Sequence, residues 1–171
     1  MNTLAFVDST LPNLNTLLSG MPTNVQVHLL PAGRDGMEYI AHTLIGRGGI
    51  DTLHLLCHGS PGQLHIGSIT LRRQDLPHYA ASLDMMSDTM TPEGQWLIYG
   101  SDVAAGAEGQ HFLEALRLMT GLHVAASSHT VGAAALGGNW TLDDACQPPR
   151  HALSIAQWHG VLSRATARHV G

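Results

Sequence analysis

Two short segments place a histidine and a hydroxyl group where they could support acyl transfer. His58-Gly59-Ser60 follows the apolar segment Thr52–Cys57, and Gly100-Ser101-Asp102 follows the apolar segment Gln95–Tyr99. If both segments are parallel strands, their carboxyl ends meet at one edge of a sheet, with neighbouring strands about 4.8 Å apart. A base and a nucleophile, His58 and Ser101, would then face each other across a gap that a hydrogen bond or one reacting carbonyl can fill.

The glycines beside these two residues fit the same chemistry. Gly59 would leave a bare backbone N–H aimed at the gap, and such an N–H can stabilise a developing oxyanion. The structural alternative is that strand ends in α/β folds carry glycine and serine simply to turn the chain. Histidine is also common here, with 12 residues in 171. Spacing alone therefore leaves both interpretations open.

Three further residues are candidates for binding a substrate at this edge. Asp8 closes the apolar segment Leu4–Val7, where it could receive an arginine or lysine side chain. The alternative, which we favour, is a turn aspartate that bonds its own backbone. Ser127 and Ser128 follow the apolar segment His123–Ala126 and are expected to line the cleft.

The order of elements that must position these residues is an alternation of strands and helices. Hydrophobic periodicity and turn residues predict them as follows. The strands are 4–7, 25–30, 52–57, 95–99, 123–126 and a short one at 139–142, with a hairpin at 63–66 and 69–71; the helices are 13–19, 35–45, 75–86 and 108–120. This order predicts an α/β fold with an open, mostly parallel sheet and helices on both faces.

The length of 171 residues fits one domain. We place an α/β domain at residues 1–145 and a linker with a C-terminal segment at residues 146–171. The linker is polar and contains proline, whereas Ala152–Ala167 is weakly amphipathic. The pattern does not distinguish a docked helix from an edge element there.

Composition excludes several classes of partner. The net charge of −5 and the lack of lysine argue against a nucleic-acid-binding protein. There is no apolar run long enough to span a membrane and no signal peptide pattern. Neither common nucleotide-binding motif is present, so no cofactor is expected. His54 and His58 would lie about 13 Å apart on a strand, too far to share a metal ion.

Four motifs in this order resemble a known bacterial family. They are Phe6-Val7-Asp8-Ser9, Leu53–Gly62, Leu97–Gly106 and the pair Val124–Ser127 with Gly132–Trp140. Together they are similar to the domain-of-unknown-function family numbered 4347. That family occurs near the N-terminus of very large, repeat-rich surface and adhesin-like proteins, which implies an exported or cell-surface location.

The family in turn resembles the caspase–gingipain–separase group of cysteine peptidases. That resemblance implies that His58 is the base, that Gly59 supplies an oxyanion N–H, and that position 101 is the nucleophilic cysteine. Here position 101 is serine, whose hydroxyl is far less acidic than a thiol. Three explanations stay open: a serine introduced to trap an uncleaved form, a natural loss of activity, or a working serine nucleophile.

These observations predict a caspase-like peptidase-type domain that cuts a peptide segment by acyl transfer, in its own chain or in another protein. With serine at position 101 we expect it to be inactive or trapped. One alternative is a non-catalytic module that binds a peptide or a component of the cell envelope. Another is a serine hydrolase of small esters. The sequence predicts no oligomeric state.

Overall fold

A computed structural model describes residues 2–163 of the chain. Its strands are β1 (Thr3–Asp8), β2 (Val25–Leu30), β3 (Ile50–Leu56), β4 (His58–Ser60), β5 (Gln63–Ile66), β6 (Ile69–Arg72), β7 (Met90–Tyr99), β8 (His123–Ala126) and β9 (Asp144–Ala145). Its helices are α1 (Leu14–Ser19), α2 (Gly36–Leu44), α3 (Ala80–Asp88) and α4 (Gly106–Thr120), and two 3-10 segments are η1 (Arg73–Tyr79) and η2 (Ala134–Leu136). The expected alternation of strands and helices is present.

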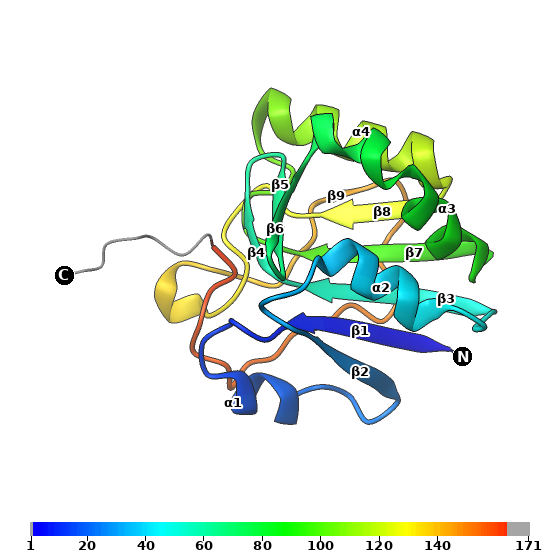
Figure 1. Ribbon diagram of the computed structural model, residues 1–171. Helices are drawn as coiled ribbons and strands as arrows, with labels where there is room; N and C mark the ends of the chain where they lie inside the picture. The colour runs from blue at the N-terminus through cyan, green and yellow to red at the C-terminus, as the bar shows by residue number, and fades with distance from the viewer. Residues whose placement is uncertain (1, 164–171) are drawn as a thin grey trace.

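The main sheet has six strands in the order β2-β1-β3-β7-β8-β9. Neighbouring strands are parallel from β2 to β8, and only β9 is antiparallel to its neighbour. The predicted open, mostly parallel α/β fold is confirmed. The carboxyl ends of the parallel strands lie together at the left in Figure 1, beside a small antiparallel sheet made of β4, β5 and β6.

Successive strand residues point to opposite faces of the sheet, so each strand contributes to two separate cores. In β7, Trp96 and Ile98 belong to one hydrophobic cluster, whereas Leu97 and Tyr99 belong to the other. The apolar run Trp96–Tyr99 at the end of this strand is typical of a parallel strand covered on both faces.

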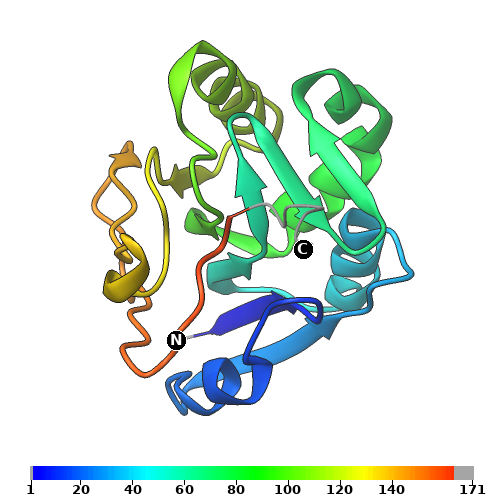
Figure 2. The same cartoon turned by 90° about the vertical axis from the view of Figure 1, so that its left-hand side faces the viewer.

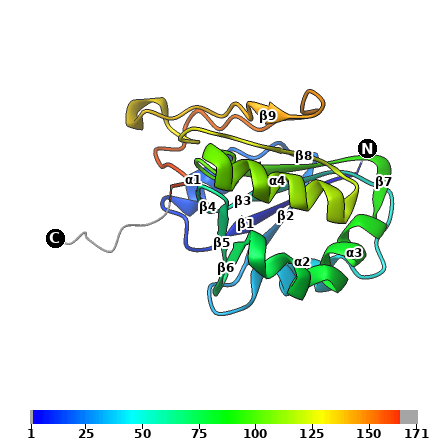
Figure 3. The same cartoon turned by 90° about the horizontal axis from the view of Figure 1, so that it is seen from above.

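The two faces are covered by different kinds of chain. The helix-covered face packs against α2, α3 and α4 through residues such as Met37, Leu83 and Phe112. The loop-covered face packs against α1 and irregular chain that includes Leu142 and Trp158. Figure 3 shows α2 and α3 on one side of the sheet and β9 with its flanking chain on the other.

Three local expectations need correction. His58–Ser60 was expected to be a loop but forms β4, which pairs with β5 and makes the predicted hairpin three-stranded. The first part of the predicted helix 75–86 is the 3-10 segment η1, which contains Pro77; proline lacks the backbone N–H that a regular helix needs. The strand expected at 139–142 is absent. The chain there makes a single bridge, between Asn139 and Val131, and it pairs with the main sheet only further on, at β9.

The described part of the C-terminal segment, residues 146–163, lies against the loop-covered face. Four of its apolar residues are fully or almost fully buried: Leu153, Ile155, Trp158 and Leu162. No helix occurs between residues 146 and 163, and the rest of the expected element at 152–167 lies outside the described residues. Figure 2 shows this chain, in red, crossing the edge where the strands end. Within residues 2–163 no helix has the length and apolarity of a membrane span.

Candidate active site

The loops after β3 and β7 bring His58 and Ser101 to the same edge of the sheet. The two strands are paired in parallel, with Leu56 opposite Tyr99 at their carboxyl ends. His58 therefore begins β4 just beyond one strand end, and Ser101 lies just beyond the other. The predicted juxtaposition of these two loops is present.

Gly59 is required by how closely the two loops approach. A Cβ atom at this position would lie 2.8 Å from the carbonyl oxygen of Ser101 and 2.7 Å from a methyl group of Val103. The turn after Ser101 is also tight, because Asp102 has φ of +64°, a left-handed conformation that few residues other than glycine adopt. This packing aims the N–H groups of Gly59 and Ser101 at one point.

That point is occupied by the carbonyl oxygen of Leu162. The N–H of Gly59 donates to this oxygen at 2.8 Å, and the N–H of Ser101 donates to it at 2.9 Å. Two backbone N–H groups that converge on one carbonyl oxygen at this distance have the geometry of an oxyanion hole. The expected oxyanion donor Gly59 thus has a second donor beside it, in Ser101 itself.

The chain before Leu162 is bound along its backbone, as peptides are bound when they add to a sheet edge. The N–H of Leu162 donates to the carbonyl oxygen of Val131 at 2.8 Å, and the N–H of Ala133 donates to the carbonyl oxygen of Gly160 at 2.8 Å. Gly132 pairs with Val161 in an antiparallel bridge between these two bonds. Residues 160–162 are thereby held extended and in a fixed register.

His58 lies on the other side of the Leu162–Ser163 peptide bond. Its Nδ1 is 2.7 Å from the carbonyl oxygen of Ser163, and Ser163 also forms a parallel bridge with Gly59. A carbonyl oxygen only accepts hydrogen bonds, so Nδ1 carries the hydrogen. The imidazole therefore contacts the residue whose nitrogen would leave if this bond were broken.

The hydroxyl of Ser101 is completely buried and is held by the backbone of Val131. Its Oγ accepts a hydrogen bond from the N–H of Val131 at 2.9 Å, while the carbonyl oxygen of Val131 holds Leu162. Among the hydrogen bonds of residues 2–163 there is none between His58 and Ser101. The two side chains are linked instead through the bound segment, which fills the gap between the loops.

The three candidate substrate-binding residues have partners elsewhere. Asp8 is buried, accepts from the N–H and hydroxyl of Thr10, and accepts from the N–H of Gly67, so it is a turn aspartate as favoured above. Ser127 bonds within its own turn to His129. Ser128 bonds to the carboxylate of Asp143.

Cys57 does not supply a reactive thiol at this edge. Its side chain belongs to the helix-covered face, although it directly precedes His58. Burial, followed by the nearby negative charge of Asp8, raises the pKa of Cys57 far above its ordinary value. This thiol stays protonated and is inert as a nucleophile.

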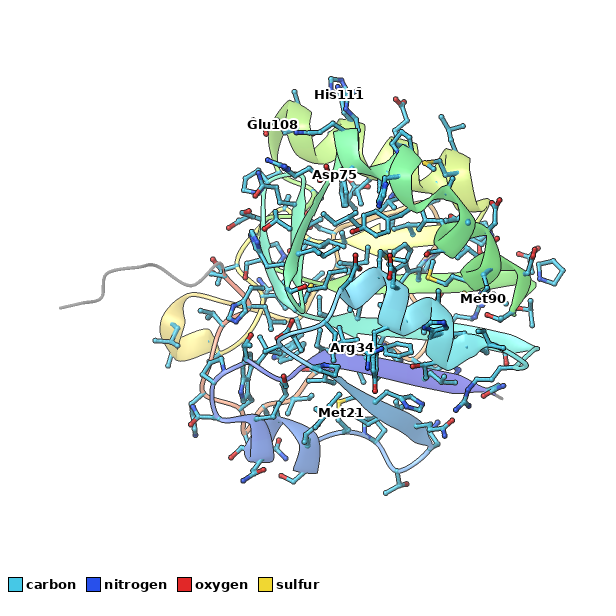
Figure 4. All side chains as sticks on the ribbon, in the orientation of Figure 1. Met21, Arg34, Asp75, Met90, Glu108 and His111 are labelled. Carbon is cyan, nitrogen blue, oxygen red and sulfur yellow. The ribbon has the colours of Figure 1, made fainter. Side chains whose placement is uncertain are left out.

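Other places in the molecule offer less for chemistry. Within residues 2–163 there is no cluster of three or more histidine, cysteine, aspartate or glutamate side chains that could hold a metal ion. A hollow of about 300 Å³ lies between the hairpin and α4, where Arg72, Glu108 and His111 line it. In Figure 4 the labelled Glu108 and His111 lie at the top of the molecule, away from the edge that the C-terminal chain crosses.

The residues that bind the segment were missed by sequence reasoning. Val131, Gly132 and Ala133 contribute through their backbones, so their side-chain types carry no chemical signal. The glycine at position 132 is the one signal in the sequence, because its φ is +133° and a Cβ there would lie 2.4 Å from the carbonyl oxygen of Gly160. A glycine in this small-residue stretch was visible in the sequence, but its partner was not.

Comparisons with known proteins identify a family and little else. No curated protein matches the chain. A solved structure titled "Crystal structure of a small-chain dehydrogenase" shares 8% identity over 70% of both chains with a TM-score of 0.30, which carries no functional argument. The model of the family described as "Domain of unknown function (DUF4347)" matches residues 4–162. The chain belongs to this family.

Proposed function

We propose that this chain is a caspase-like, self-cleaving peptidase-type domain whose substrate is its own Leu162–Ser163 bond. Serine replaces cysteine at the nucleophile position and leaves this chain uncleaved or very slow. One observation carries the proposal: the carbonyl oxygen of Leu162 accepts hydrogen bonds from both Gly59 and Ser101. A carbonyl held in this way is polarised for attack.

The proposed reaction is an acyl transfer followed by hydrolysis. The side chain of residue 101 attacks the carbonyl carbon of Leu162, and the two N–H donors stabilise the oxyanion. Collapse of this intermediate breaks the bond to the nitrogen of Ser163, and His58 passes the nucleophile's proton to that nitrogen. Water then hydrolyses the acyl group, which leaves a carboxylate on Leu162 and an amine on Ser163.

Serine at position 101 is expected to leave this bond intact. A thiol near an imidazole is readily converted to thiolate, but a serine hydroxyl requires a base in direct contact. Here the Ser101 hydroxyl is bonded to Val131 and has no hydrogen bond to His58 among the described residues. A serine in this geometry binds the segment without attacking it.

The two alternative functions have less support. Ser101 has no exposed surface, and residues 161–163 cover the groups around it, which argues against a hydrolase of small esters. The chain's own residues 160–163 fill the groove between the loops after β3 and β7. This argues against a site that is free to capture a separate peptide or envelope component. The expected occurrence of this family near the N-terminus of adhesin-like proteins supports an exported or cell-surface location.

Restoring the thiol tests the proposal. We expect Ser101→Cys to convert the chain into fragments 1–162 and 163–171, which mass spectrometry distinguishes from other cuts. The matched control is Ser101→Cys combined with His58→Ala, which should stay intact. If Ser101→Cys folds normally and remains uncleaved, or if both variants are cut alike, the proposal is wrong.

A further inference from the structure

The segment before the proposed cleavage site is built into the core of the domain. Leu153, Ile155 and Trp158 are each 0–2% exposed and belong to the cluster on the loop-covered face. The indole N–H of Trp158 donates to the carbonyl oxygen of Pro12 at 2.7 Å, and the N–H of Leu153 donates to the Tyr99 hydroxyl at 2.8 Å. The segment is therefore part of the folded domain up to Leu162.

On the leaving side of the bond, the described part of the chain ends after one residue. Ser163 is the last described residue, and its contacts are the hydrogen bond to His58 and the bridge to Gly59. Breaking the Leu162–Ser163 bond would separate this firmly packed segment from Ser163, which contacts the His58 imidazole and the backbone of Gly59. The segment that ends at Leu162 would therefore stay in place after cleavage.

The new end would remain in the site that produced it. Its carboxylate oxygen can accept the same two N–H groups of Gly59 and Ser101, and bonds to a charged acceptor are shorter and stronger than bonds to a neutral one. Because the end is tethered, its effective concentration in the groove is in the millimolar range or above. A free peptide at micromolar concentration cannot compete with it.

We propose, on the basis of the function proposed above, that the catalytic form of this domain cleaves only its own chain and does so once. The Leu162 carboxylate then plugs the oxyanion hole and prevents turnover of any other peptide. The substrate is thus fixed by packing of the C-terminal segment in cis and not by recognition of a free peptide.

The experiment combines three measurements on Ser101→Cys. Its rate of self-cleavage should be first order and unchanged over a hundredfold range of protein concentration. A tagged Ser101→Ala chain mixed with it should remain intact. A peptide ending in Gly-Val-Leu with a fluorogenic leaving group should give less than one turnover per molecule of cleaved protein.

Two results would overturn the inference in distinguishable ways. If Ser101→Cys is never cleaved, the proposed function fails and this inference fails with it. If Ser101→Cys is cleaved at Leu162 but then cuts the tagged chain, or turns over the peptide repeatedly, the proposed function stands and the single-turnover inference alone is wrong.

Discussion

The two faces of the sheet are held by different kinds of interaction. On the helix-covered face, the backbone hydrogen bonds of α2, α3 and α4 are made within each helix. Each of these helices packs one apolar face against the sheet. On the loop-covered face, α1 has only six residues, and most of the cover is chain without regular structure. That chain is fixed by single hydrogen bonds to distant residues, such as Trp158 to Pro12.

This difference explains why the proposed site and the C-terminal segment depend on each other. Gly59 and Ser101 follow strands that are anchored on both faces, but the other half of the site, residues 131–133, belongs to the irregular cover. Those residues bind Gly160 and Leu162. The buried side chains of the preceding chain, such as Trp158, hold Gly160 and Leu162 in place. Disturbing the loop-covered face should therefore disturb the site, whereas an equal disturbance of the helix-covered face should not.

The largest expected effect comes from removing one large side chain from each face. Trp158→Ala and Phe112→Ala both empty fully buried positions, and each should lower the free energy of unfolding by about 3–5 kcal/mol. In a Ser101→Cys background only Trp158→Ala should expose the thiol at position 101 to a thiol-reactive reagent. Denaturant unfolding measures the first effect, and labelling at residue 101, located by mass spectrometry because the exposed Cys146 reacts in both variants, measures the second. Equal labelling of both variants would contradict the coupling of segment and site.

Protonation of His54 should weaken the loop-covered face as pH falls. His54 is completely buried beside Tyr99, and neither ring nitrogen has a hydrogen-bond partner. Burial, followed by the charge of His151, lowers the pKa of His54 from 6.5 to about 4. The folded state then binds fewer protons than the unfolded state between these values, so stability rises with pH from about 4 to about 6.5.

The loss on acidification across that range should be about 3 kcal/mol. Urea unfolding at several pH values measures it, and His54→Gln should remove this part of the pH dependence. Because other groups also titrate, the comparison of slopes between the two proteins is the decisive quantity. An unchanged slope in His54→Gln would show that His54 is not responsible.

Gly132 should be sensitive to a single added methyl group. Gly132→Ala would place its Cβ 2.4 Å from the carbonyl oxygen of Gly160, which pushes the segment out of register. In the Ser101→Cys background we expect cleavage to slow by roughly 100-fold, since small misplacements of reacting groups have effects of this size. The matched control is Gly121→Ala at the end of α4, which also has positive φ but has no atom within 4 Å of the added methyl. Equal cleavage rates in the two variants would refute the proposed register.

The smallest effect is expected at a hydrogen-bonded clamp on the linker. The buried side chain of Gln95 donates to the carbonyl oxygen of Pro148 and accepts from the N–H of Arg150. Gln95→Ala should lower the free energy of unfolding by about 1–3 kcal/mol, whereas Gln74→Ala, at an exposed position, should change it by about 0.5 kcal/mol at most. Thermal unfolding would detect the difference, and equal values would mean that the clamp contributes nothing.

Local sequence patterns were sufficient to predict the scaffold. The strand at 25–30 and the strand at 123–126 have the predicted bounds, and Asp35, the first residue of the predicted helix 35–45, caps α2 by accepting from the N–H of Glu38. These features depend on residues within a few positions of one another. The placement of His58 and Ser101 at one edge also followed, because parallel strands end on the same side.

Contacts between distant residues decided the rest. His58 and Ser163 are 105 positions apart, and the segment 160–163 binds through backbone groups that every residue type carries. Sequence periodicity reports which face of an element is apolar, but it does not report which distant chain covers that face. The gap between the two loops was therefore predictable from the sequence, whereas only the tertiary structure revealed that the protein's own chain fills it.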